Sequence, residues 1–88
     1  AGRPTDALSH FTEALQIQPK FSEARLKRAV ALAVAGNSDH AKVELEFLIA
    51  DEPDYADAHY QLGRVYTRLG DRAKASAHLQ RFQRLRRP

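Results

Sequence analysis

Turn-forming and packing residues recur in this chain every 34 positions. Six series keep that step: Gly2, Gly36 and Gly70; Pro19 and Pro53; Ala7, Ala41 and Ala75; Phe11, Leu45 and Leu79; Ala14, Leu48 and Phe82; and Phe21 and Tyr55. Such a period indicates an array of similar units, because one small unit cannot bury its apolar face until a neighbour covers it. The 88 residues leave room for a truncated unit followed by two further ones.

Between the glycines and prolines, apolar residues recur three and four positions apart. Two such runs are Ala7, Leu8, Phe11, Ala14 and Leu15, and Leu62, Val65, Tyr66 and Leu69. This is the spacing of an amphipathic helix and not the alternation of a strand. Alanine is abundant, with 15 residues, and glycine and proline are scarce, with 4 each, which also favours helix. We predict five helices, over residues 4–18, 22–35, 38–51, 56–69 and 72–86.

The predicted helix ends carry the residue types that such ends require. Gly36 and Gly70 follow helices, where a left-handed backbone is easiest without a Cβ atom. Asn37 or Ser38, and then Asp71, stand where the next helix needs a side-chain acceptor for its first N–H groups. Pro19 and Pro53 are expected to stop the second helix of each unit, because proline cannot continue the hydrogen-bond ladder.

The last unit carries a recognisable signature. Its residues are His59-x-x-Leu62-Gly63-x-x-Tyr66 and Ala75-x-x-x-Leu79, and the first unit has Ala7-x-x-x-Phe11. With the period of 34 and the helix stops, this pattern resembles the tetratricopeptide repeat family, with histidine where that family prefers tryptophan. The middle unit matches less well, because Arg28 stands where Leu62 stands one period later. We expect the stem of Arg28 to lie along apolar surface while its charged end finds water or a carboxylate.

The resemblance implies an all-α helical solenoid, with five antiparallel helices in a short right-handed superhelix. The expected division is residues 1–21 as the second helix of a truncated repeat, 22–55 as a full repeat, and 56–88 as a full repeat lacking its final turn. Close helix approach is expected at the pairs Ala29/Gly63 and Ala41/Ala75, with Leu32/Tyr66 and Leu45/Leu79 filling the seams.

Catalytic and metal-binding chemistry finds little support in the sequence. The chain has no cysteine, and no two of its four histidines have the three- or four-residue spacing of ligands on one helix face. The acidic residues around Pro53, which are Asp51, Glu52, Asp54 and Asp57, suit helix ends and a solvated turn. We therefore predict no enzymatic activity, no cofactor and no metal. We also expect no transmembrane segment, because no apolar run approaches the ~20 residues that one needs.

In each unit, one face of the first helix carries none of the residues assigned to packing. The residues of this face that we predict to bind a ligand are Leu26, Lys27, Val30, Asp57, Tyr60, Gln61, Arg64 and Arg68. The family resemblance implies that they line a concave groove that takes peptides or partner helices. Tyr60 would be an anchor off the packing seam, and Arg64 and Arg68 would pair with carboxylates. The Lys and Asn residues with which some family members clamp a terminal carboxylate are absent, since Leu26, Val30 and Gln61 stand at those places.

The predicted partner is therefore a protein or peptide, with acidic residues favoured, and the predicted function is that of an interaction or scaffold module. Two alternatives stay open. The uncapped ends of the solenoid, near Phe11 and Phe82, would allow self-association into a homo-oligomer. The last predicted helix, with six basic residues and no acid between Arg72 and Pro88, would allow polyanion binding. Nucleic acid is the less favoured partner, because the net charge is only +3 and no interleaved set of aromatic residues accompanies the arginines.

Overall fold

The computed structural model describes residues 8, 10, 12–15 and 21–87, and within them every regular element is an α-helix. Four complete helices follow one another: α2 (Ser22–Val34), α3 (Ser38–Asp51), α4 (Ala56–Leu69) and α5 (Arg72–Arg86). Residues 8, 10 and 12–15 are also helical, and the rest of the predicted helix 4–18 lies outside the described residues. The predicted bounds of the four complete helices are met to within one residue.

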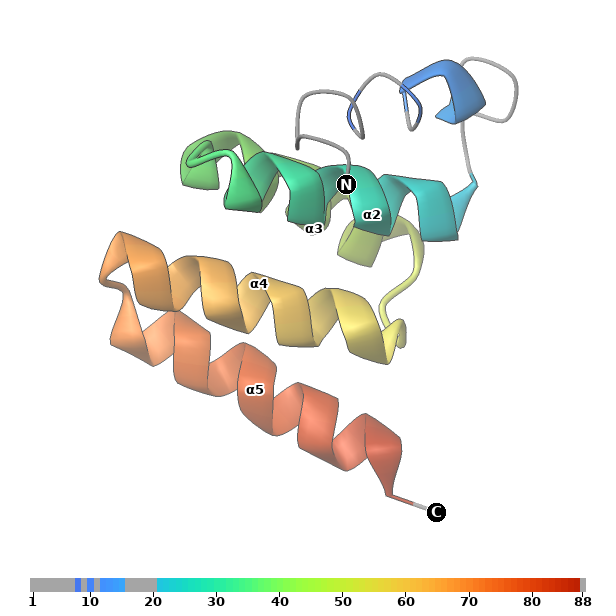
Figure 1. The fold of residues 1–88 in the computed structure, drawn as a ribbon. Helices are drawn as coiled ribbons and strands as arrows, with labels where there is room; N and C mark the ends of the chain where they lie inside the picture. The colour runs from blue at the N-terminus through green and yellow to red at the C-terminus, as the bar shows by residue number, and fades with distance from the viewer. Residues whose placement is uncertain (1–7, 9, 11, 16–20, 88) are drawn as a thin grey trace.

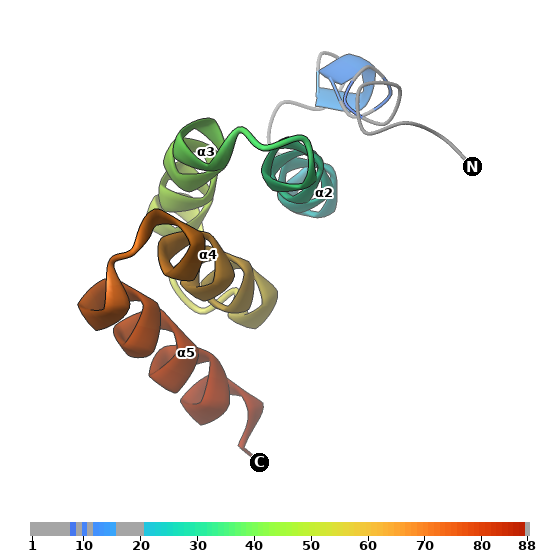
Figure 2. The same cartoon turned by 60° about the vertical axis from the view of Figure 1, so that its left-hand side comes forward.

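Successive helices pack as antiparallel neighbours, α2 on α3, α3 on α4 and α4 on α5 (Figure 1). Seen closer to end-on, α2 and α4 form one layer and α3 and α5 the other (Figure 2). A direct contact between α2 and α4 joins the first helices of the two units. The predicted all-α helical solenoid is therefore confirmed.

Two of the predicted helix ends and one of the predicted caps are present. Gly36 and Gly70 follow α2 and α4 with φ of +91° and +83°, a backbone conformation that residues with a Cβ atom rarely adopt. The Asp71 carboxylate accepts a hydrogen bond from the Lys74 backbone N–H over 3.1 Å and so caps α5. Asn37 occupies the cap position of α3, but its side chain makes no capping hydrogen bond, so that part of the prediction is wrong. The helix before Pro53 ends at Asp51, and Pro19 lies outside the described residues.

The core is a continuous apolar cluster between the two layers. Its residues are Ala29, Leu32, Ala41, Leu45, Leu48, Ala58, Leu62, Val65, Tyr66 and Ala75. Three leucines among them, Leu45, Leu48 and Leu62, are fully buried. The small residues Ala29, Gly63, Ala41 and Ala75 are all buried, as predicted for close helix approach.

The charged end of Arg28 was expected to meet water or a carboxylate, and it pairs with a carboxylate. The side chain of this residue is 27% exposed, and its guanidinium pairs with Glu44 of α3 over 3.1 Å. The charged end of Arg28 therefore bridges α2 and α3, while its stem is covered by the unit.

Candidate functional site

A shallow hollow lies where α2 and α4 meet in the layer that these two helices form. Its lining residues are Val30, Ala33, Val34, Gln61, Arg64, Val65 and Arg68. Four of the predicted ligand-binding residues, Val30, Gln61, Arg64 and Arg68, therefore come together at one place. The hollow itself holds about 40 Å³, which is room for little more than one or two water molecules or a methyl-sized group. A bound segment would therefore lie along the surface with only a small side chain inserted.

The floor of this hollow is apolar and its rim is cationic. Val34 is 62% exposed on the last turn of α2, which is unusual for a valine in a helix that packs on both neighbours. Arg68 donates from a guanidinium nitrogen to the backbone carbonyl of Ala33 over 2.8 Å. That carbonyl belongs to the last turn of α2, and it also accepts the backbone N–H of Gly36 over 3.1 Å. The bond holds Arg68 across the gap between the two helices.

Arg64 stands one helical turn before Arg68 and is exposed. Its guanidinium lies over the ring of Tyr60, with 5.9 Å between the central carbon and the ring centroid. In the part of the chain that the structure describes, no ion pair joins Arg64 or Arg68 to a carboxylate. Two like charges one turn apart on a helix repel each other, so this rim favours an anionic group.

The other predicted residues of the groove behave differently from one another. Leu26 is half-buried and packs against the core, so its side chain serves the fold as well as the surface. Lys27 pairs with Glu23 on its own helix over 3.0 Å, and Asp57 is exposed at the start of α4. Tyr60 was expected to lie off the packing seam, but it lies in the seam between α4 and α5. Its ring lies 4.9 Å from that of Phe82 in α5 and is half-buried.

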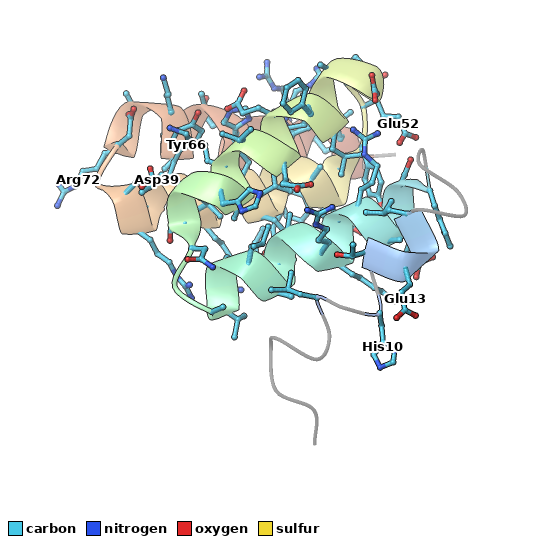
Figure 3. All side chains as sticks on the ribbon, turned by 90° about the horizontal axis from the view of Figure 1, so that it is seen from above. His10, Glu13, Asp39, Glu52, Tyr66 and Arg72 are labelled. Carbon is cyan, nitrogen blue, oxygen red and sulfur yellow. The ribbon has the colours of Figure 1, made fainter. Side chains whose placement is uncertain are left out.

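The acidic turn around Pro53 is largely neutralised by partners distant in sequence. Asp51 pairs with Arg25 of α2 over 2.8 Å, and Asp54 pairs with Arg81 of α5 over 2.6 Å. Glu52 accepts a hydrogen bond from the Ser22 hydroxyl at the start of α2. Figure 3 shows Glu52 at the C-terminal end of α3. These contacts connect the turn to α2 and α5. They agree with the expectation that the acidic residues serve helix ends and a turn. They also remove Arg81 from the free basic residues of α5.

Sequence reasoning missed a pair of histidines between α4 and α5. The Nδ1 atoms of His59 and His78 are 3.1 Å apart, and the rings are stacked with 5.3 Å between centroids. The Nε2 atom of buried His59 is 2.7 Å from the carbonyl oxygen of Pro53. Because a carbonyl only accepts, Nε2 of His59 donates to it, and a hydrogen bond between the two Nδ1 atoms requires a proton on one of them. The only sequence signal was that the two residues, 19 apart, belong to adjacent antiparallel helices.

Tyr66 continues this buried polar cluster toward α3. Its ring stacks on His78 with 5.7 Å between centroids, and its hydroxyl donates to Glu46 over 2.5 Å. Burial, together with the bond to Glu46 and its charge, raises the pKa of Tyr66 to about 12. Burial lowers the pKa of His78 below its ordinary 6.5, and the neighbouring His59 and Lys74 lower this pKa further. The Glu46 carboxylate acts in the opposite direction and raises it. The cluster therefore favours neutral His78 and neutral Tyr66.

The histidine pair predicts a loss of stability in acid. Because the pKa of His78 is lower in the folded than in the unfolded chain, the unfolded chain binds more protons between the two values. The contribution of neutral His78 is fully present above about pH 6.5 and is lost as the pH falls through the folded pKa. One residue adds at most about 1.4 kcal/mol per pH unit to the slope of the free energy of unfolding. Urea unfolding between pH 5 and 7.5 measures that slope.

The matched variants are His78→Gln, which removes the titrating group, and His10→Gln, which changes an exposed histidine. We expect His78→Gln to flatten the pH dependence and His10→Gln to leave it unchanged. Equal slopes in the wild type and the His78→Gln variant would contradict the assignment.

Metal and membrane chemistry add nothing to this site. Among the described residues, no group of three or more metal-ligating side chains lies together. No helix in the same residues is long and apolar enough to cross a bilayer.

The fold defines a class: this chain is a helical-repeat protein built from stacked antiparallel hairpins. The profile of the tetratricopeptide repeat matches residues 1–51 and again residues 36–85. The chain belongs to the tetratricopeptide repeat family, and the resemblance stated from the sequence is confirmed. Repeats of this family generally mediate contacts between proteins, and their proteins generally act as adaptors rather than as enzymes.

The curated relatives that the chain matches are much longer proteins. It is 35% identical over 78 residues to the TPR repeat-containing thioredoxin TTL4 of Arabidopsis thaliana, covering 89% of this chain and 11% of that protein. It is 32% identical over 77 residues to the Hsp70-Hsp90 organizing protein of Triticum aestivum, covering 88% of this chain and 13% of that protein. The chain thus spans about a tenth of the length of these relatives.

Two solved structures have closely similar folds. YrrB, described as a TPR protein with an unusual peptide-binding site, superposes with a TM-score of 0.86 at 28% identity, covering 94% of this chain and 43% of YrrB. MamA superposes with a TM-score of 0.87 at 27% identity, covering 97% of this chain and 50% of MamA.

Proposed function

We propose that this chain is a protein-interaction module that binds an acidic peptide or partner segment in the groove between α2 and α4. The observation that carries the proposal is the apolar hollow with two exposed guanidiniums on its rim, neither of which has a carboxylate partner in the described residues. The two repeats expected from the sequence, 22–55 and 56–88 without its final turn, each supply one of the two helices.

The chemistry of the rim favours a carboxylate next to a small apolar side chain. Arg64 and Arg68 each offer planar N–H donors that match the two oxygens of a carboxylate. The exposed face of Val34 and the half-buried Val30 offer apolar contact to a neighbouring side chain. Because the hollow is small, a large aromatic anchor would not fit into it, and affinity would rest on contacts spread along the segment. For so short an array we expect an affinity on the order of micromolar.

The relatives support a protein partner without naming one. YrrB is described as having an unusual peptide-binding site, and the Triticum aestivum relative is named an Hsp70-Hsp90 organizing protein. We extend only the general role, the binding of a protein segment, to this chain. By the same reasoning we propose that the chain has no catalytic activity of its own.

Peptides that bind the chain can be selected from a displayed library of random twelve-residue sequences, and the proposal predicts their composition. Selection on the whole chain should enrich peptides containing Asp or Glu beside small aliphatic residues. Arg64→Glu should weaken a selected peptide by about tenfold or more, because a carboxylate then meets a like charge in place of a charge-assisted hydrogen bond. Tyr60→Ala should also weaken binding, because it removes the ring on which Arg64 lies. Calorimetric titration measures both effects.

Arg72→Glu is the matched control, because Arg72 is an equally exposed arginine at the start of α5 (Figure 3). It should change affinity less than twofold, and circular dichroism should show an intact helical fold for every variant. Unchanged affinity in both Arg64→Glu and Tyr60→Ala would refute the groove.

A further inference from the structure

Four side chains form a continuous row of contacts that begins at the groove and ends on the last turn of α5. Arg64 lies over the ring of Tyr60 at 5.9 Å, and Tyr60 lies against Phe82 at 4.9 Å between centroids. Arg86 in turn lies over the ring of Phe82 at 5.2 Å. We call this set the arginine–aromatic row. Because Arg64 also lines the hollow between α2 and α4, the row joins that hollow to the C-terminal end of α5.

The fold does not require this row, and the chain itself provides the comparison. The positions 34 residues earlier hold Leu26, Val30, Leu48 and Glu52. In that unit Leu26 packs against the core and Leu48 is fully buried, so two aliphatic side chains meet the same packing demand. The aromatic pair and the two arginines are therefore particular to the last unit.

The row holds two cations ready for an anion. In the described part of the chain, neither Arg64 nor Arg86 pairs with a carboxylate. A guanidinium that lies over a ring uses its face for that contact and keeps the N–H donors of its edge free. Holding it there also reduces the conformational entropy that binding would otherwise cost. From position 72 to the end, the chain contains six basic residues and no acid, so α5 itself supplies no carboxylate to these donors.

The stacking also distinguishes between two kinds of anionic partner. Single-stranded nucleic acid is bound by bases that stack on free aromatic faces. Here Tyr60 contacts Phe82 and Arg64, and Phe82 contacts Tyr60 and Arg86, so both rings already have partners within the chain. Guanidinium N–H donors beside rings that already have partners suit carboxylates.

We infer that the bound segment continues from the hollow across Tyr60 onto the C-terminal end of α5, where the arginine–aromatic row holds two carboxylates of an acidic protein segment. This inference rests on the groove function proposed above and specifies where the segment leaves the groove. The hollow takes one part of the segment, and Arg86 takes an acidic side chain further along it.

The test is an NMR titration of the whole chain with a synthetic twelve-residue peptide in which Glu alternates with Ala and Val, and with its Gln counterpart. The Glu peptide should shift the methyl signals of Val30 and Val34 and also the ring signals of Phe82 and the side-chain N–H of Arg86. Arg86→Gln should weaken binding by about tenfold, the effect of one charge-assisted hydrogen bond. Arg84→Gln is the matched control, because Arg84 is another basic residue of the last turn of α5; it should weaken binding less than twofold.

Phe82→Leu restores the residue type of the preceding unit and should keep the fold. It should weaken binding as Arg86→Gln does, because Arg86 loses the ring that orients it.

Equal losses in Arg84→Gln and Arg86→Gln would overturn the inference, because they would indicate unspecific attraction to the basic helix. Shifts at Val30 and Val34 without shifts at Phe82 and Arg86 would also overturn it, while the groove function would stand. Shifts at neither place would count against both. Stronger shifts at Phe82 with the oligonucleotide dT12 than with the Glu peptide would overturn the assignment to a protein partner.

Discussion

Leu45→Ala should reduce the free energy of unfolding by about 2–5 kcal/mol, the range for truncating a buried leucine. Leu45 lies in the centre of α3, is fully buried, and belongs to the cluster that joins both layers of the solenoid. Its loss removes apolar contacts on two sides and leaves a cavity that the rigid neighbouring helices cannot close. Since domains of this size have only about 5–15 kcal/mol in total, the variant should melt at a much lower temperature in a urea or thermal unfolding experiment.

Leu69→Ala is the matched control for this prediction. Leu69 ends α4 and is 37% exposed, so the same chemical change there should cost far less. Similar losses at Leu45 and Leu69 would mean that the core does not lie between the layers as the structure shows.

Gly63→Ala should destabilise the chain, although alanine favours a helix by about 1 kcal/mol over glycine. A Cβ atom at Gly63 of α4 would lie 2.7 Å from Cγ and 2.8 Å from Cδ2 of Leu79, and 3.3 Å from the carbonyl oxygen of Ala75. The two helices approach so closely that the Leu79 side chain or α5 must shift to make room, and overpacking of this kind costs about 1–3 kcal/mol. The free energy of unfolding in urea measures the sign of the change.

A double-mutant cycle separates the clash from other effects of the substitution. Leu79→Ala removes the two nearest side-chain atoms, so Gly63→Ala should cost much less in that background than in the wild type. Stabilisation by Gly63→Ala alone would show that helix propensity outweighs packing here, and would contradict the close approach of α4 and α5.

The period of 34 residues predicted the helices closely because each unit faces the same local demands. Gly36 and Gly70 end helices for a reason that is visible in the sequence, since only glycine adopts their backbone conformation without strain. Asp71 likewise carries a capping carboxylate in the right position. Asn37 has an equally suitable side chain, yet it does not cap, because propensity does not decide which of several partners a side chain finds.

The aromatic and histidine contacts between helices are those that the sequence did not predict. His59 and His78 fall at unrelated positions of the repeat, and only the rotation of α4 and α5 about their axes brings their Nδ1 atoms within 3.1 Å. The same rotation places Tyr60 against Phe82, which the period alone assigned to separate roles. A repeat shows which residues are equivalent, but it does not show which residues of neighbouring helices face each other.

The stripe that was predicted to bind a ligand was therefore only partly resolved by its spacing. Gln61, Arg64 and Arg68 share one face of α4 and meet Val30 of α2, as helical spacing alone suggests. Whether Leu26 would reach the core depended on how deeply α2 sits against its neighbours, which one sequence does not reveal.

The most direct measurement is paramagnetic broadening by a library-selected peptide that carries a nitroxide label. If a partner segment lies between α2 and α4, the amide signals of Val30, Val34 and Arg64 should broaden first. Broadening confined to Val43 and Phe47, two apolar residues that are 46% and 66% exposed on α3 in the other layer, would contradict the groove and place the partner there instead.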